Sequence, residues 1–313
     1  MDNQTLNADI LILEGLKVTP QSSIPAFILL LLMYIFIMVS NIGLVVLIFM
    51  KRSLHQPMYL LFCNMSINEV FGATIVVPHI LRDLFVADSE RYIHYIVCVV
   101  QAFCVNLYGG ACHTILMTMT FDRYMAICNP LRYTVIMTNG MVVKLSVAAW
   151  VVVLVMVSIM LSITIRLSRC RRFIDNAHCD NASLFKLSCE DVIINHVFGL
   201  SYSLLLLGSS IGSVTLTYLK IAAVCLQSKN KTLNSKALQT CATHLTLYII
   251  LVWFAFIIII LHRFPHLSDY RKVVTTVGEV ALPALNAVIY GLQIKEIRQK
   301  IVTLFQRKGH LQR

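Results

Sequence analysis

Residues 24–50 read IPAFILLLLMYIFIMVSNIGLVVLIFM, a stretch without a single charged side chain. A helix needs about 20 apolar residues to cross the ~30 Å hydrocarbon core of a bilayer, so this stretch is long enough to do so. The whole chain has the same character: its 313 residues are 58% hydrophobic and only 13% charged, with a mean hydropathy of +0.77. Soluble domains carry about 25% charged residues, so the composition excludes an ordinary soluble protein.

Further blocks meet the same length test, which gives seven predicted spans. They are residues 24–50, 58–81, 92–121, 145–165, 192–219, 237–262 and 273–292. Glu69 and Glu279 are the only carboxylates inside them. No connection is large enough for a separate domain, so we expect an all-α membrane protein, a seven-transmembrane helix bundle that forms one domain over residues 1–313. Residues 1–23 are then an extracellular amino terminus, 24–292 the bundle and 293–313 a cytoplasmic tail.

Basic residues are divided unequally between the two sides of this bundle. The connections 51–57, 122–144 and 220–236 and the tail together hold 15 Lys and Arg and 2 acidic residues, whereas the opposite side holds 11 of each. The positive-inside rule therefore predicts an exterior amino terminus. Topology explains the net charge of +11, so no nucleic-acid partner is expected.

The tail adds a second contact with membrane lipids. Apolar residues recur on one helical face there, with basic residues opposite: Ile294, Ile297, Ile301, Leu304 and Phe305. This pattern predicts a short amphipathic helix that lies on an anionic lipid surface.

Cysteines and sequons fit the same topology, because disulfides persist on the oxidising side of a membrane. Four cysteines fall on the expected exterior: Cys98, Cys170, Cys179 and Cys189. Two bridges are possible, and the sequence alone leaves three pairings open. A zinc site at His178 and Cys179 is a weak rival, since adjacent residues suit tetrahedral coordination poorly, and no metal is expected. The sequons at Asn3 and Asn181 are candidate glycosylation sites.

The end of the third span carries the most specific motif. It reads Met117-Thr-Met-Thr-Phe-Asp-Arg-Tyr-Met-Ala-Ile-Cys128, followed by Asn129-Pro-Leu-Arg-Tyr133. This segment resembles the MAYDRYVAIC-PLRY signature of vertebrate olfactory receptors, a branch of the rhodopsin-like (class A) G protein-coupled receptors. Asn41-Ile-Gly, LHQPMY at 54–59, KALQTCATHL at 236–245 and PALNAVIY at 283–290 resemble further motifs of that family, in the same order. The ordered set is far more specific than a lone Asp-Arg-Tyr.

The resemblance implies which residues couple the receptor to its partner. An arginine at the edge of a span is costly unless it is paired, and Asp122 is the adjacent partner of Arg123. By resemblance, Asp122, Arg123 and Tyr124 hold the resting state, and Arg123 is freed to face a heterotrimeric G protein of the olfactory stimulatory type. Asn286 and Tyr290 would act with them in activation. The implied location is the plasma membrane, in the cilia of olfactory sensory neurons.

A core polar network is expected between three spans. Glu69 stands where the family usually has Asp, and we expect it to interact with Asn41 and Asn286. Ala287 replaces the proline that usually follows Asn286, which indicates a milder break in the last span. The family template also pairs Cys98 with Cys179, and Cys170 with Cys189.

The ligand is expected between the parts of spans three, five, six and seven that lie toward the exterior. Counting along the third span from Arg123, the lining residues would be Asn106, Leu107, Gly110 and Ala111, with His113 deeper. His262-Arg-Phe resembles a segment of the fish-like branch of the family, which suggests that Arg263 pairs with an anionic, polar odorant. An ionised Glu279 would favour a cationic ligand instead, so the sequence leaves the ligand's charge open.

Two other classes of function were weighed. The sequence has no Gly-rich phosphate loop, GxSxG or HExxH, so neither an enzyme nor a bound cofactor is expected. A transporter or channel with Glu69 and Glu279 as an ion or proton relay is the stronger rival. Transporters commonly contain paired halves with interrupted helices, and this sequence lacks such a repeat.

Overall fold

The computed structural model describes residues 9–87, 90–227, 231–294 and 298, and in this part of the chain it contains the seven predicted spans. They are the long helices α2 (Pro20–Met50), α3 (Pro57–Asp83), α4 (Tyr95–Cys128), α6 (Asn139–Ile165), α8 (Ile193–Gln227), α9 (Lys231–Leu261) and α10 (Ser268–Gln293). Each contains a stretch that is long and apolar enough to cross a membrane. The chain is therefore a multi-pass membrane protein with the predicted helical fold.

Several helices extend beyond the predicted spans. The apolar pattern of the third span ends at residue 121, but α4 continues to Cys128. Similarly, α8 continues to Gln227, beyond the predicted end of the fifth span at residue 219. Helix α9 begins at Lys231, before the predicted start of the sixth span at residue 237. Hydropathy marks only the part of a helix that suits lipid, whereas backbone hydrogen bonds continue into the polar region beyond it.

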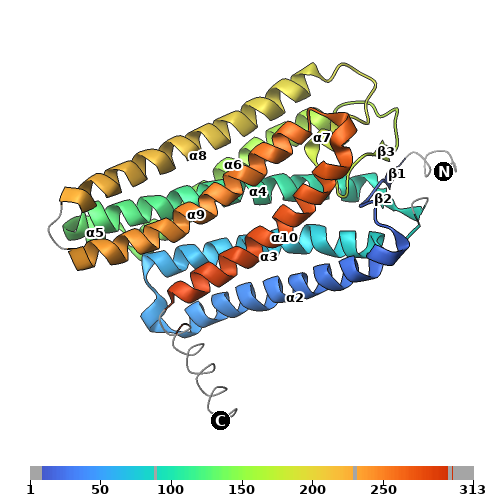
Figure 1. Ribbon diagram of the computed structural model, residues 1–313. Helices are drawn as coiled ribbons and strands as arrows, with labels where there is room; N and C mark the ends of the chain where they lie inside the picture. The colour runs from blue at the N-terminus through green and yellow to red at the C-terminus, as the bar shows by residue number, and fades with distance from the viewer. Residues whose placement is uncertain (1–8, 88–89, 228–230, 295–297, 299–313) are drawn as a thin grey trace, which may run out of the picture.

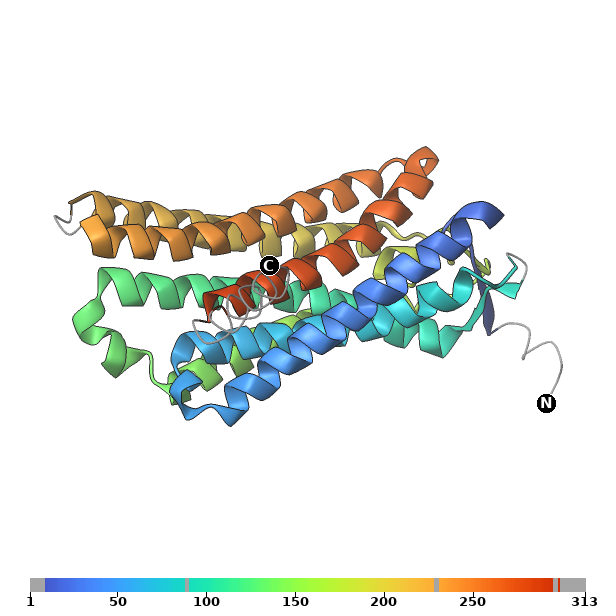
Figure 2. The ribbon, with the colours of Figure 1, turned by 60° about the horizontal axis from the view of Figure 1, so that its bottom comes forward.

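Helix α4 forms the centre of the bundle, where it packs against α3, α6 and α8 (Figure 1). On another side, α10 packs against α2, α3 and α9 (Figure 2). The most hydrophobic window of α2 has a mean hydropathy of 2.6, yet only 22% of it is buried within the protein. Its apolar side chains thus face outward, as expected of a helix in contact with lipid.

One end of the bundle carries a small sheet that was not predicted. It consists of β1 (Ile10–Leu13), β2 (Tyr92–His94) and β3 (Phe173–Ile174), and β1 lies in the middle, antiparallel to β2 and parallel to β3. The short helix α7 (Asn181–Phe185) lies at the same end, which we call the strand end (Figure 1). Strands of two to four residues are too short for a periodic pattern to reveal them.

The opposite end, called the α5 end, carries the short helix α5 (Pro130–Ile136) and the 3₁₀ turn Arg52–Leu54. The predicted amphipathic helix of 293–313 lies mostly outside the described residues, as does Asn3. Ile294 is the one predicted apolar residue of the tail that the structure describes, and it is buried against the bundle.

Both disulfides have the pairing of the family template. Cys98 in α4 is bonded to Cys179, and Cys170 is bonded to Cys189, with Cα–Cα distances of 5.3 Å and 5.8 Å. The first bridge ties the connection between α6 and α8 to the central helix. That connection therefore lies across the strand end of the bundle.

Candidate functional site

A cavity of about 360 Å³ lies between α4, α8, α9 and α10, toward the strand end. Its wall on α4 includes Asn106, Gly109, Gly110 and His113, and the connection around α7 covers its strand-end side. The residues nearest the centre of the bundle are mostly apolar, among them Leu207 and Leu251. Such a volume and lining suit a small organic molecule.

Four of the six predicted ligand residues line this cavity: Asn106, Gly110, Arg263 and Glu279. The prediction was wrong for Leu107 and Ala111, which are 8% and 0% exposed and pack against neighbouring helices. Consecutive residues of a helix point about 100° apart, so the rotation of α4 about its axis decides which of them face the cavity. That rotation is set by the packing of α3, α6 and α8.

Glu279 of α10 lies in the cavity wall with one weak contact. Its Oε1 atom is 3.6 Å from Nε2 of His178, and its side chain is 13% exposed. Oε2 has no hydrogen-bond partner among the described residues. Glu279 is thus an incompletely satisfied carboxylate beside an empty volume.

Asp180 is the second acidic residue in the wall, and its contacts are satisfied. It accepts a hydrogen bond from the backbone N–H of Ser183 at 2.6 Å, and Nε2 of His262, which directly follows α9, lies 3.2 Å from its Oδ2 atom. Burial would raise the pKa of the Asp180 carboxyl, but the ion pair with His262 and the hydrogen bond from Ser183 lower it well below its usual range. Asp180 caps α7 and ties it to α9. Sequence analysis missed this pair, although Asp before a short Asn-Ala-Ser segment is a typical helix cap.

Asn181, a candidate glycosylation site in the sequence, lies at the start of α7. Its side chain is buried, and its Oδ1 atom accepts a hydrogen bond of 2.7 Å from the Thr164 hydroxyl of α6. Thr164 also accepts from Asn195 of α8 at 3.0 Å. Thr164 thus links Asn181 of α7 to Asn195 of α8.

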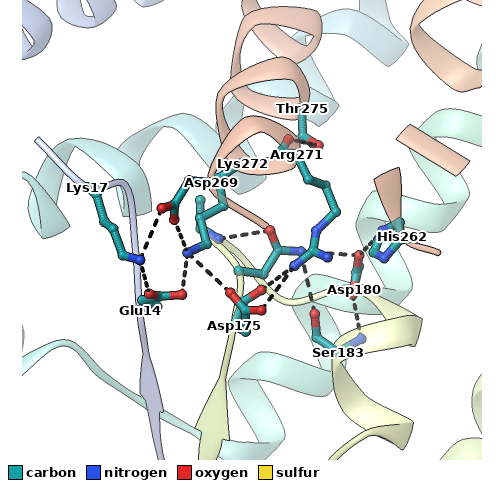
Figure 3. A network of polar contacts seen from close by, with 12 residues as sticks. Glu14, Lys17, Asp175, Asp180, Ser183, His262, Asp269, Arg271, Lys272 and Thr275 are labelled. Carbon is teal, nitrogen blue, oxygen red and sulfur yellow. Dashed lines mark hydrogen bonds and ion pairs between the residues drawn. The ribbon is translucent and has the colours of Figure 1, made fainter. Parts of the chain in front are cut away.

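An ionic cluster joins three segments that lie far apart in the sequence (Figure 3). Lys272 of α10 is 1% exposed, and its ammonium group contacts Glu14, Asp175 at 3.2 Å and Asp269 at 3.2 Å. Lys17 adds contacts to Glu14 at 2.9 Å and to Asp269 at 3.1 Å. We call these residues the strand-end ionic cluster. It connects the segment before α2, the connection that carries β3, and the beginning of α10.

The pKa values in this cluster follow from its contacts. Burial opposes ionisation of Glu14, but hydrogen bonds with Asp175, Lys272 and Lys17 lower the pKa of its carboxyl to about 2. Burial and the neighbouring Glu14 carboxylate raise the pKa of Asp175 above its usual range. Both carboxyl groups contact the ammonium group of Lys272.

The wall of the cavity toward the bundle centre contains buried hydrogen bonds between three helices. The hydroxyl of Ser210 in α8 lies 3.3 Å from Nδ1 of His113 in α4 and 2.8 Å from the hydroxyl of Tyr248 in α9. His113 itself lines the cavity. A change at the cavity thus reaches α8 and α9 through polar contacts.

The predicted core polar network is present in part. Glu69 is fully buried and accepts hydrogen bonds from Asn286 at 2.5 Å and from the Tyr108 hydroxyl at 2.9 Å. Asn41 does not join by any hydrogen bond among the described residues. Its amide nitrogen donates to the carbonyl of Ile37 at 3.0 Å, and its Oδ1 has no partner there. Tyr108, which the sequence prediction did not include, takes that place.

At the α5 end, Asp122 holds Arg123. Asp122 is fully buried, and its Oδ2 accepts from Arg123 at 2.5 Å while its Oδ1 accepts from the Tyr133 hydroxyl at 2.9 Å. The ammonium group of Lys220 lies over the ring of Tyr124, 5.8 Å from the ring centroid. Tyr290 of α10 is fully buried and stacks on Phe62 of α3, with ring centroids 4.5 Å apart.

The helices are in contact with one another at this end. Ile221 and Cys225 of α8 form a buried cluster with Cys241 of α9, and this cluster packs against Tyr124 and Ile127 of α4. We call it the α5-end contact. No group of His, Cys, Asp and Glu that could hold a metal ion occurs within the described ranges.

Seven membrane-spanning helices, a cavity toward one end of the bundle and a paired Asp-Arg at the other are typical of a class A G protein-coupled receptor. Comparison with known proteins identifies the family within this class. The profile of the family described as olfactory receptor matches residues 30–308.

Individual olfactory receptors are similar in sequence to most of this chain. Olfactory receptor 2F1 of Homo sapiens is 33% identical over 311 residues, which cover 97% of this chain and 96% of that receptor. Olfactory receptor 52N5 of Homo sapiens is 33% identical over 280 residues, covering 88% and 86%. Olfactory receptor-like protein OLF3 of Canis lupus familiaris is 30% identical over 297 residues, covering 95% and 93%. The chain belongs to the olfactory receptor family, so it is an odorant-sensing receptor and not an enzyme.

Proposed function

We propose that this receptor binds a small, polar odorant in the cavity between α4, α8, α9 and α10, and activates a stimulatory olfactory-type G protein at the α5 end. The observation that carries the proposal is the cavity of about 360 Å³, whose wall includes His113. From there, buried hydrogen bonds reach Ser210 and Tyr248, which lie on the helices that meet at the α5-end contact. Asn106, Gly110, Arg263 and Glu279 are the proposed ligand contacts.

The mechanism is a shift between two arrangements of the helices. An odorant favours the active arrangement only by the difference between its affinities for the two states. In that arrangement the α5-end contact opens, Arg123 leaves Asp122, and the freed surface of α4, α8 and α9 receives the G protein. The change in helix arrangement passes between Glu69 and that surface through three side chains: Asn286, Tyr290 and Tyr124. The receptor promotes nucleotide exchange and makes no covalent bond itself.

Orientation is part of the proposal. The distribution of basic residues supports a strand end that faces the exterior and an α5 end that faces the cytosol, in the plasma membrane of olfactory cilia. An amino-terminal epitope tag should then be detected on intact cells, and a carboxy-terminal tag only after permeabilisation. Detection of both tags on the same face would contradict this topology.

The function is tested by a cyclic-AMP assay in cells that carry the olfactory-type stimulatory G protein, with odorant mixtures as stimuli. We expect an odorant-dependent rise that Arg123→Ala abolishes at equal surface expression. An odorant-dependent current that persists without any G protein would support the transporter alternative. The structure gives that alternative no direct support, because Glu69 is held by Tyr108 and Asn286 within the core.

A further inference from the structure

Four charged side chains of the described residues line the cavity: Asp180, Lys186, Arg263 and Glu279. Lys186 and Arg263 are exposed to solvent, so both positive charges lie at the mouth of the cavity. Asp180 has hydrogen-bond or ion-pair partners on Ser183, Asn176 and His262. Glu279 differs from all three because it is mostly buried and only weakly paired.

No hydrogen bond to the Glu279 carboxylate occurs among the described residues. Its Oε2 atom has no hydrogen-bond partner among the described residues, and the nearest basic side chain there is His178, with 3.6 Å between Oε1 and Nε2. A separation of 3.6 Å is too long for a hydrogen bond. A buried acceptor without a donor is costly, so a donor that enters the cavity at this point relieves that cost.

The apolar surroundings of Glu279 strengthen the attraction between its carboxylate and a positive charge. The Phe254 ring lies against Gly278, so close that an added Cβ atom there would be 3.0 Å from it. Leu251 and Leu282 continue the same apolar wall. Charges attract more strongly beside such a wall than in water, where Arg263 is solvated and screened. The carboxylate is therefore the charged group of the cavity that binds a complementary charge best.

We propose that Glu279 selects ligands with a positively charged nitrogen, and that the ligand class is small aliphatic amines. The ammonium group donates to the Glu279 carboxylate, and the alkyl chain packs along Phe254, Leu251 and Leu282. This inference rests on the proposed function, since it assumes that the cavity is the ligand site. It opposes the expectation of an anionic odorant at Arg263, because the exposed guanidinium competes with water and salt whereas Glu279 does not.

The test uses straight-chain alkylamines, with the carboxylic acids and alcohols of equal length, on the full-length receptor. Two readouts are measured: thermal stabilisation of purified receptor, which needs no G protein, and cyclic AMP in cells. We expect amines to bind best, and Glu279→Gln to weaken amine binding at least tenfold while leaving alcohol binding nearly unchanged. Retained alcohol binding also shows that the variant is folded.

The matched control is Glu90→Gln, which removes an exposed carboxylate outside the cavity and should leave amine binding unchanged. Unchanged amine binding in Glu279→Gln, or a preference for acids that Arg263→Ala removes, would overturn the inference. Failure of the proposed function gives a different pattern. In that case amines stabilise the purified receptor through Glu279, but no ligand raises cyclic AMP.

Discussion

Gly109 and Gly110 are neighbours in α4 with different surroundings, although both line the cavity. A Cβ atom added to Gly109 meets nothing within 4 Å, whereas one added to Gly110 would overlap Val153 and the Tyr202 hydroxyl. The absent side chain at Gly110 thus lets α6 and α8 approach α4 closely. At Gly109 the absent side chain contributes volume to the cavity.

These neighbours give a matched pair of variants for a stability measurement. We expect Gly110→Ala to destabilise the receptor by ~1–3 kcal/mol, because the added methyl group overpacks a tight contact. Gly109→Ala should stabilise it slightly, since alanine is favoured over glycine in helices by about 1 kcal/mol. Thermal unfolding of the two purified variants measures the difference. Equal melting temperatures would mean that α4 packs differently here.

Tyr133 is the residue through which α5 supports the Asp122–Arg123 pair. Tyr133→Phe removes the hydrogen bond of 2.9 Å to Asp122 and leaves a buried carboxylate oxygen with one donor fewer. A loss of about 1 kcal/mol from the resting state shifts its equilibrium with the active state by a factor of about five. We expect ligand-free cyclic AMP to rise accordingly at equal surface expression. Lower basal signalling would show that Tyr133 supports the active state instead.

At the scale of elements, the short helix α7 closes the strand-end side of the cavity, and its position depends on Asp180. The groups that face this carboxylate are His262, His178 and, at a greater distance, Lys186. Because the pKa of Asp180 is lowered in the folded receptor, the unfolded chain takes up its proton first as pH falls. Asp180 thus stabilises the fold above pH ~4 and progressively loses this effect below it.

The lowered pKa of Asp180 gives the stability of the receptor a measurable pH dependence. The melting temperature of the wild-type receptor should exceed that of Asp180→Asn above pH ~4, and the margin should shrink as the pH falls below about 4. Thermal unfolding of both proteins in the same detergent, from pH 7 to pH 3, measures it. A margin that stays constant or grows in acid would contradict the assigned role of the carboxylate.

The elements differ in how far the sequence revealed them. The spans could be predicted because lipid tolerates only long uncharged helices, and residues 24–50 meet that condition without any knowledge of their neighbours. The sheet could not, since β1 exists only because residues 92–94 and 173–174 lie beside it. The strand-end ionic cluster has the same origin, because Glu14 and Lys272 are far apart in the sequence and meet only in the fold.

At the scale of the whole molecule, the α5-end contact holds α4, α8 and α9 together. Ile221 is 1% exposed in this contact, whereas Leu226 on the same helix is 87% exposed. We expect Ile221→Ala to weaken the contact by ~2–5 kcal/mol and to raise ligand-free nucleotide exchange on the purified G protein. Leu226→Ala is the control and should change neither stability nor exchange. A folded Ile221→Ala receptor with unchanged basal exchange would show that this contact does not restrain the helices.

The candidate site was predictable only where local sequence decides it. Asp122 and Arg123 are adjacent, so their pairing followed from the cost of an arginine at a span edge. Leu107 and Ala111 failed as ligand residues because the rotation of α4 depends on the side chains of other helices. Asn41 failed as a member of the Glu69 network for a similar reason, since Tyr108 reaches the carboxylate instead.

The middle strand β1 has a consequence for how the receptor is synthesised. The ribosome makes this strand before any span, yet its partner β3 follows the fourth span and Lys272 belongs to the last one. The contacts of the amino-terminal segment with β3 and Lys272 therefore form only after nearly the entire polypeptide has been made. A nascent chain that stops short of α10 lacks Lys272 and Asp269, so the strand-end ionic cluster is completed last.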